Sequence, residues 1–349
     1  MNNQKLYQRA YDPLSFTAEQ KARIAASAAA AASAGKEEPR RKLRLIGKTA
    51  VAACLICVLA IGAEAAGIRI SVSSILSPIF GGTSAQTEVI DKIGRPINAR
   101  DTDCGVTIQA DAIIGDRYNA CIIFSIRRDD GTPLLPEDVT VGQLTIGGFC
   151  DIRLQKKGGS HGRSWFVARG NELQYIYSIS ADMPLNTGSA KAEFQDISYF
   201  DGEKISPLVE GNWNLCFDVN YEDSSVYFGE GSKFSQNTMN FTITEASVSP
   251  IGIRVAYEVD SQVQWSNAPS GRQPEEDRLQ WARYFEDVQI LLTKKDGTVL
   301  DLSNSGGSVH PEDGKTYCTK SRVFEQIIPL DDVAAIRIGG IDFPIGDIY

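Results

Sequence analysis

The feature that most constrains this chain is an uncharged apolar run over residues 49–63, TAVAACLICVLAIGA, with a basic cluster over residues 40–48 immediately before it. Extended to residues 45–68, the run has 24 residues, and a helix needs about 20 to cross the ~30 Å hydrocarbon core of a membrane. Lys48 and Glu64 would lie near its two ends, where charged side chains can reach the headgroups. Because basic residues favour the cytoplasmic side, the sequence predicts a single-pass protein of the cell membrane with its N-terminus in the cytoplasm and its C-terminal part extracytoplasmic.

Two other interpretations of the same run are open. Ala63-Glu64-Ala65 has the small-x-small form of a signal-peptide cleavage site, but the 48 residues before the run are far more than a usual signal peptide carries. A buried core helix is the third interpretation, and the flanking basic cluster argues against it. The uncleaved membrane anchor is therefore favoured.

Charge is distributed unevenly along the chain. Ten Lys and Arg against four acidic residues give residues 1–48 a net charge of +6, so the remainder of a chain whose total is −9 carries −15. A basic tail beside a membrane is attracted to anionic lipid, which makes membrane lipid an expected partner. Nucleic acid is not expected as a partner, because its binding needs clustered Lys and Arg that the acidic remainder lacks.

The predicted cytoplasmic tail, residues 1–44, contains one helix-forming segment. Residues 17–20, TAEQ, have the form of an N-terminal capping box and begin an alanine-rich run that continues to residue 34. This helix is either a solvated spacer or a segment that folds against a cytoplasmic partner. Partner binding would use the few large apolar side chains of the tail, which are Tyr7, Tyr11, Leu14, Phe16 and Ile24.

Residues 69–100 are expected to form a stalk, in which residues 86–93 could make two helical turns capped by Ser84. Val89, Ile90 and Ile93 would share one face of these turns and pack on the domain that follows. Residues 71–78 are expected to be extended or turn-like.

From Cys104 onward the hydrophobic period changes to two, which is typical of β-strands. We expect a mostly β part made of two immunoglobulin-like β-sandwich units, a first domain over residues 101–245 and a second over residues 246–349. A single intertwined domain is the alternative. Four Asp-Gly dipeptides, at residues 130, 201, 296 and 313, predict hairpin turns in which both residues take positive φ.

Several stretches of this part carry a resemblance to a known family; they are residues 87–97, 105–108, 111–118, 249–252 and 329–333. Over residues 40–349 the chain resembles membrane-anchored proteins of Gram-positive bacteria that contain the domain of unknown function 4179. The resemblance implies an anti-sigma-factor-type architecture, with a cytoplasmic sigma factor as partner, and it supplies no catalytic residues. Residues 1–48 contain neither His nor Cys, so the tail departs from the zinc-binding anti-sigma class, which uses a His-x₃-Cys-x₂-Cys site.

No motif of the sequence indicates an enzyme, a cofactor or a metal site. The two histidines, His161 and His310, lie in Gly/Ser- or Pro-containing stretches that are expected to be exposed loops. The five cysteines outside the apolar run are odd in number and irregularly spaced, so no disulfide framework is expected. Cys121 and Cys216 are expected to be buried as small hydrophobic residues.

Four tryptophans remain as candidates for an exterior binding surface. Trp213 alternates with Leu215 and Phe217 and is expected in the core, whereas Trp265 and Trp281 flank a polar insert over residues 260–283 and are expected to be exposed. We therefore expect a regulatory membrane protein whose extracytoplasmic module senses an unidentified ligand. The alternative is an envelope-displayed binding or structural module whose tail is passive.

Overall fold

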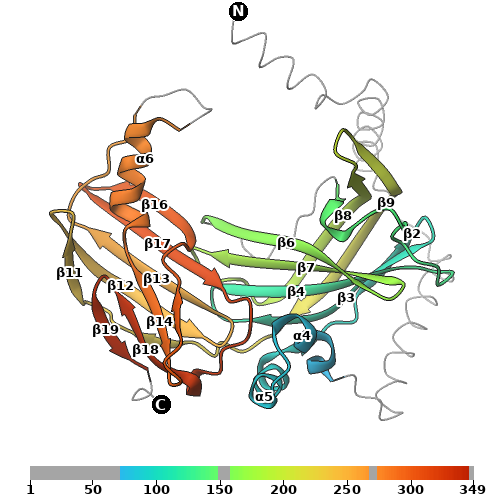
Figure 1. Cartoon of the computed structure of the whole chain (residues 1–349), viewed down its shortest axis with the longest axis horizontal. Coiled ribbons are helices and arrows are strands. Elements are labelled where there is room, and N and C mark those ends of the chain that lie inside the picture. The colour runs from blue at the N-terminus through green and yellow to red at the C-terminus, as the bar shows by residue number, and fades with distance from the viewer. Residues whose placement is uncertain (1–70, 148–157, 267–272, 346–349) are drawn as a thin grey trace, which may run out of the picture. The chain divides into compact units, whose positions relative to one another are not determined.

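The computed structural model describes residues 71–147, 158–266 and 273–345 (Figure 1). Among these residues no helix is both long and apolar enough to cross a membrane. The predicted tail at 1–44, with its five partner-binding residues, and the predicted span at 45–68 lie outside the described residues. Within them the chain is mostly β, with four antiparallel sheets arranged as two sandwiches and helices at their margins.

The first sandwich is made of sheets A and B. Sheet A has the strand order β1-β3-β4-β7-β6, with β2 also paired to β3, and sheet B has the order β5-β8-β9. The strands of sheet A are β1 (Arg95–Pro96), β2 (Arg100–Asp103), β3 (Val106–Gly115), β4 (Asn119–Arg128), β6 (Ser160–Arg169) and β7 (Glu172–Ala181). Sheet B contains β5 (Leu144–Ile146), which follows the short helix η2 (Val141–Gln143), together with β8 (Gly188–Phe200) and β9 (Ile205–Val219).

The core between sheets A and B is apolar and rich in aromatic rings. Trp213 of β9 is fully buried, and its indole Nε1 donates a hydrogen bond to the carbonyl oxygen of Val106 at 2.9 Å, which ties β9 to β3. The rings of Phe124 and Phe194 meet edge to face with their centroids 5.0 Å apart, one from each sheet. The expectation that Trp213 belongs to the core is confirmed.

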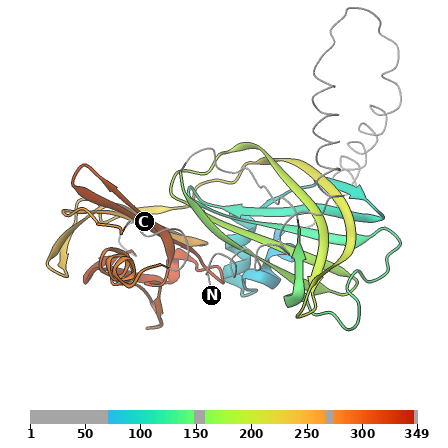
Figure 2. The same ribbon diagram turned by 90° about the horizontal axis from the view of Figure 1, so that it is seen from above.

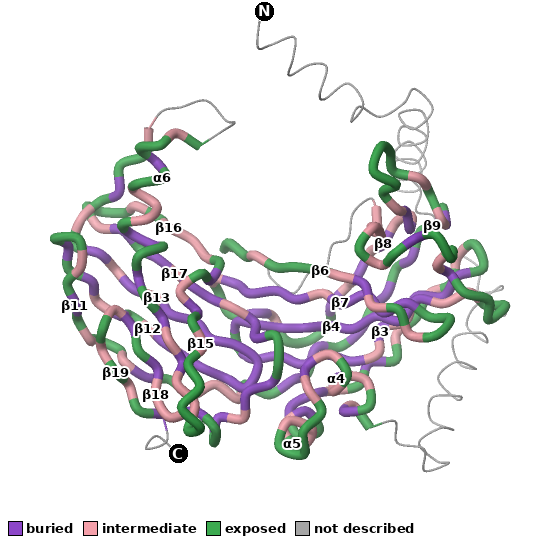
Figure 3. Tube along the Cα trace, in the orientation of Figure 1, coloured by how far each residue is buried: buried purple, intermediate pink, exposed green. Residues whose placement is uncertain are grey.

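Sheet A is covered on both faces at its centre, so residues of both parities are buried in its central strands β4 and β7 (Figure 3). Its second face is covered by α4 (Val72–Phe80) and α5 (Ser84–Ile93) (Figure 2). Thr83 caps α5, because its hydroxyl accepts a hydrogen bond from the Gln86 amide while the Gln86 side chain accepts one from the Thr83 amide. The region predicted as a stalk is therefore a helix pair packed on a sheet.

Packing of α5 follows the expected face, since Ile90 and Ile93 are buried against sheet A and Val89 is partly buried there. Two details differ from the sequence prediction. Residues 72–80 are helical rather than extended, and the cap of α5 is Thr83 rather than Ser84.

The second sandwich is made of sheets C and D. Sheet C has the order β10-β12-β13-β17-β16, with β11 also paired to β12, and sheet D has the order β15-β14-β18-β19. The strands of sheet C are β10 (Val226–Phe228), β11 (Lys233–Gln236), β12 (Met239–Ser249), β13 (Gly252–Val259), β16 (Gly306–Glu312) and β17 (Lys315–Val323). Sheet D contains β14 (Ile290–Lys294), β15 (Val299–Asp301), β18 (Val333–Ile338) and β19 (Ile341–Pro344). The helices of this half are α6 (Glu275–Trp281), the π-helical turn η3 (Ala282–Glu286) and η4 (Leu330–Asp332).

The border expected between residues 245 and 246 falls inside β12, which pairs with β13 on both sides of that point. The first core ends at Tyr221 and the second begins at Phe228, so the border between the two sandwiches lies between these residues. Of the four Asp-Gly dipeptides, only Asp313-Gly314 has positive φ at both residues, 49° and 79°; the other three have it at the glycine alone.

Candidate functional site

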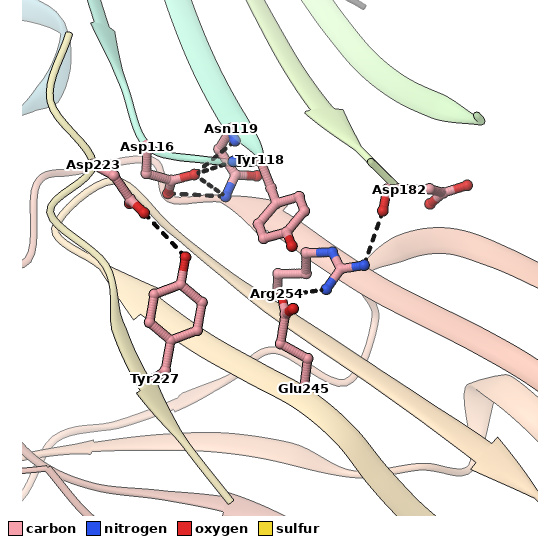
Figure 4. Close-up of polar contacts among 8 residues, drawn as sticks. All are labelled: Asp116, Tyr118, Asn119, Asp182, Asp223, Tyr227, Glu245 and Arg254. Carbon is pink, nitrogen blue, oxygen red and sulfur yellow. Dashed lines mark hydrogen bonds and ion pairs between the residues drawn. The ribbon is translucent and has the colours of Figure 1, made fainter. Parts of the chain in front are cut away.

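The residues that join the two sandwiches form the most elaborate polar site among the described residues. Its centre is Asp116, in the tight turn between β3 and β4. One carboxylate oxygen of Asp116 accepts hydrogen bonds from the amides of Tyr118 and Asn119, at 2.8 and 2.7 Å, an arrangement typical of an aspartate-stabilised turn. Both oxygens also accept from the side-chain amide of Asn119 (Figure 4).

The second carboxylate oxygen of Asp116 reaches the other sandwich. It accepts a hydrogen bond of 2.5 Å from the hydroxyl of Ser249, the last residue of β12. The same hydroxyl accepts from the amides of Ile251 and Gly252, both at 3.2 Å, and so also holds the turn between β12 and β13. Asp116 and Ser249 are 2 % and 1 % exposed, and an unpaired polar group at this depth costs several kcal/mol. The two turns are therefore tied together by one buried hydrogen bond, between Ser249 and Asp116.

A second contact across the junction centres on Arg254 of β13, which is only 7 % exposed. Its guanidinium lies 4.0 Å from the ring centre of Tyr118 and donates to Glu245 at 2.8 Å and to the carbonyl oxygen of Asp182 at 2.9 Å (Figure 4). Glu245 belongs to the same sandwich as Arg254, whereas Tyr118 and Asp182 belong to the other. A buried guanidinium needs several such partners, so this contact fixes the alignment of the two sheets.

The linker between the sandwiches is held to the same turn. Asp223 accepts a hydrogen bond from the amide of Arg117 at 3.3 Å and another from the hydroxyl of Tyr227 at 3.0 Å. Farther along the junction, His161 of β6 donates from Nε2 to the carbonyl oxygen of Ser321 in β17 at 3.0 Å. His161 is thus a partly buried strand residue rather than an exposed loop residue, and His310 lies in β16.

The helix pair takes part in the junction through the segment that follows β17. Ile327 is buried in the same cluster as Leu76 and Phe80 of α4, and its amide donates to the carbonyl oxygen of Phe80 at 2.8 Å. The carbonyl oxygen of Ile327 accepts from the side chain of Gln86 in α5 at 3.0 Å. Residues 72–93 therefore contact both sandwiches.

Burial shapes the titration of the site. It raises the pKa of Asp116 above its ordinary value, against the lowering effect of the hydrogen bonds from Ser249 and Asn119. Burial and the neighbouring Glu245 raise the pKa of Tyr118 to about 12. No group of three His, Cys, Asp or Glu side chains that could hold a metal ion occurs in the described part of the chain. The arrangement joins turns and strands of the two sandwiches through buried hydrogen bonds.

Of the two tryptophans proposed as an exterior binding surface, one is exposed and the other is partly buried. Trp265 follows β13 and is 37 % exposed. Trp281 of α6 is partly buried against the second core, with its ring centre 4.5 Å from that of Phe285. The expected exposure of Trp281 is therefore wrong, because the helix turns its ring toward the sandwich.

The cysteines also differ in part from expectation. Cys121 is buried as predicted, but Cys216 is exposed, since it alternates with the inward residues Leu215 and Phe217 of β9. Cys104, Cys121, Cys216 and Cys318 are all free thiols.

Sequence reasoning did not single out Asp116, Ser249 or Arg254 as site residues. Two signals were present: an Asp three residues before an Asn at the end of an apolar strand, and an arginine in the middle of the apolar run of β13. Each pattern also has a local explanation: the first is typical of a turn, and the second of an edge strand. The pairing between them depends on tertiary structure.

Asp111 lies in β3, five residues before Asp116, and its raised pKa can be tested by substitution. Burial raises its pKa to about 6, while Ser125 and Gln109 donate hydrogen bonds to it, each at 3.1 Å. Because the folded pKa lies above the unfolded one, its contribution to stability is lost as the pH rises from about 4 to 6. Asp111→Asn is expected to raise the free energy of unfolding by about 1–2 kcal/mol at pH 7.5 and by nothing near pH 4. Urea denaturation at both pH values measures this, and an equal effect at both would contradict the assignment.

No family model matches the chain, and no curated protein matches it. A solved structure described as the crystal structure of the conserved domain protein from Bacillus anthracis aligns with a TM-score of 0.45 and 14 % sequence identity. The alignment covers 70 % of this chain and 75 % of that chain.

Proposed function

We propose that this chain is a single-pass membrane regulator, in which an extracytoplasmic β-rich module of two immunoglobulin-like sandwiches senses a ligand and a cytoplasmic tail restrains a sigma factor. The observation that carries the proposal is the place of α4 in the sequence and in the packing. Helix α4 begins at Val72, four residues after the end of the predicted span at residue 68, and it packs into the cluster that contains Ile251 and Ile327 of the second sandwich.

A sensor must connect the place where a ligand acts to the place where the response occurs. In this chain any relative movement of the sandwiches would disturb the Asp116–Ser249 hydrogen bond and the Ile327–Phe80 contact. Movement at the second contact would reach α4, and from there the predicted span by chain continuity. An effect of this kind needs a difference in ligand affinity between two arrangements of the junction.

The alternative is an envelope-displayed binding or structural module with no regulatory tail. It is favoured by the number of polar contacts at the junction, which would equally serve to keep a passive module rigid. The two proposals differ in what residues 1–44 bind, and this difference can be tested directly.

The test uses the full-length chain in detergent as bait for a cell lysate, beside the variant Leu14→Asp/Phe16→Asp. A regulator is expected to capture a sigma factor through the wild-type tail and to lose it in the variant, because these two residues supply much of the apolar surface of the tail. Variant Lys21→Ala is the matched control that leaves the apolar residues in place. Capture of no sigma factor, or equal capture by both tails, favours the passive module.

A further inference from the structure

Strand β6 is the outer strand of sheet A: it pairs with β7 on one side, and no described strand pairs with its other side, although η2 and β16 contact it. It pairs with β7 along all ten residues, so its outer edge offers an equally long row of backbone donors and acceptors. Free edges of this length invite pairing with another chain, and proteins usually protect them. The other outer strands of the described sheets are short, contain proline or are covered.

Strand β9 shows how such protection is built in this molecule. On its outer side the amides of Asn212 and Asn214 donate to the carboxylates of Asp103 and Asp101, both at 2.8 Å. Strands β1, β16 and β19 contain Pro96, Pro311 and Pro344. Strand β6 has neither proline nor an acidic residue, and it is the exception.

The face of β6 that points between sheets A and B carries mostly small residues. Its residues alternate with the outward ones and are Ser160, Gly162, Ser164, Phe166 and Ala168, of which Phe166 alone is large. A cavity of about 480 Å³ lies beside Phe166 and is lined by Leu144, Ile146, Trp165 and Tyr175, among others. This volume is in the range of cavities that hold small ligands and large side chains.

Two smaller hollows continue along the same strand. One of about 270 Å³ is lined by residues 160–164, and one of about 230 Å³ is lined by Ala168 and Gly170 together with residues 133–137. A strand added beside β6 would project alternate side chains toward these hollows, as in known cases of β-strand addition.

The charges of β6 indicate the chemistry of the added strand. Arg163 is half-exposed, with an ion-pair distance of 3.7 Å to Glu325. The Nε of Arg169 is buried and has no hydrogen-bond partner, although Glu172 stands opposite it in β7. A buried guanidinium nitrogen without a partner is costly and is satisfied by an acceptor such as a carboxylate.

We propose that β6 is the docking edge for an extended peptide of another protein, which pairs with β6, inserts one bulky apolar side chain beside Phe166 and places a carboxylate at Arg169. This proposal is independent of the membrane topology and of the sigma factor. Affinity would come from backbone pairing, and selectivity from the cavity and from Arg169.

The probe is a peptide selected from a random phage-displayed library on the full-length chain in lipid nanodiscs. We expect the selected sequences to combine one large apolar residue with Asp or Glu, and to protect the amides of residues 160–169 from hydrogen exchange. Ser164→Leu, which fills the cavity from an exposed position, is expected to weaken binding at least about tenfold. Arg169→Gln is expected to weaken it as well, and to do so most for the peptides that carry an acidic residue.

Ser235→Leu is the matched control, because Ser235 is also an exposed serine on a strand, β11 of the second sandwich. It is expected to bind the peptide as wild type does. The proposal is overturned if no peptide is selected, or if Ser164→Leu binds as tightly as Ser235→Leu. It is equally overturned if the outward amides of β6 are already protected in the unbound chain, since the edge would then be covered by this chain or by a second copy.

Discussion

Replacing Lys320 with methionine is expected to lower the free energy of unfolding of the second sandwich by about 2–4 kcal/mol. Lys320 lies in β17 and is 0 % exposed, with its ammonium group enclosed by the protein. Nζ donates to the carbonyl oxygens of Phe285 and Val288 at 2.8 and 2.9 Å and lies 4.7 Å from the ring centre of Phe285. Phe285 lies in the π-helical turn η3, and Val288 lies two residues after its end. The Phe285 carbonyl oxygen also accepts a bond of 3.2 Å from the Val288 amide, so Nζ adds a second donor at the end of this turn.

Methionine fills most of the volume of the lysine side chain but has no hydrogen-bond donor. The decrease in the free energy of unfolding therefore measures the lost hydrogen bonds rather than the cost of a cavity. Thermal or urea unfolding followed by near-ultraviolet circular dichroism would give the value. Lys315→Met is the matched control, because Lys315 is in the same strand with a partly exposed side chain that pairs with Glu258. Little change in Lys320→Met, or an equal change in both variants, would show that Lys320 does not hold η3.

The pH dependence of the free energy of unfolding, compared between wild type and Lys320→Met, provides a second readout. Burial lowers the pKa of Lys320 to about 8, below its ordinary value of 10.5. Between these values the unfolded chain keeps a proton that the folded chain has released, so wild-type stability gains from this group as the pH rises. The difference between wild type and Lys320→Met is therefore expected to widen from pH 8 to pH 10.

Replacing Ile327 with alanine is expected to loosen α4, although Ile327 belongs to the second sandwich. The side chain is 1 % exposed and lies in the cluster formed with Leu76 and Phe80. Truncating a buried isoleucine costs about 2–4 kcal/mol, and here the lost contacts are those that hold the helix pair against the segment after β17. The cluster that contains Ile327 includes residues of α4 and none of sheet D. The effect of the substitution on α4 should therefore be larger than its effect on sheet D.

How far the sequence predicts this fold depends on which residues face the core. Where inward positions are apolar and outward ones polar, as in β9, the period of two predicts the strand and even the burial of Trp213. Strand β17 lacks such a pattern, because its inward residues are Thr316, Cys318 and Lys320. Their polar atoms are satisfied by distant backbone groups, such as the carbonyl oxygen of Ser261 for Thr316. Such pairing leaves no local pattern.

The opposite case is residues 323–328, whose largely apolar sequence predicts a strand, although no strand forms beyond Val323. They instead cross from sheet C toward sheet D, with Phe324 and Ile328 buried in the second core and Ile327 in the junction. The candidate site was missed for the same reason as β17. Asp116 and Ser249 are separated by 133 residues, and nothing in either turn indicates that the other lies beside it.

The central claim is that the junction connects the second sandwich to α4, and hydrogen exchange of the α4 amides in Ile327→Ala tests it most directly. Leu302→Ala is the matched control, because it truncates a buried residue of the second core that does not belong to the junction cluster. The amides of Leu76, Ser77, Ile79 and Phe80 are expected to exchange at least about tenfold faster in Ile327→Ala than in Leu302→Ala. Equal exchange of these amides in the two variants would contradict the claim.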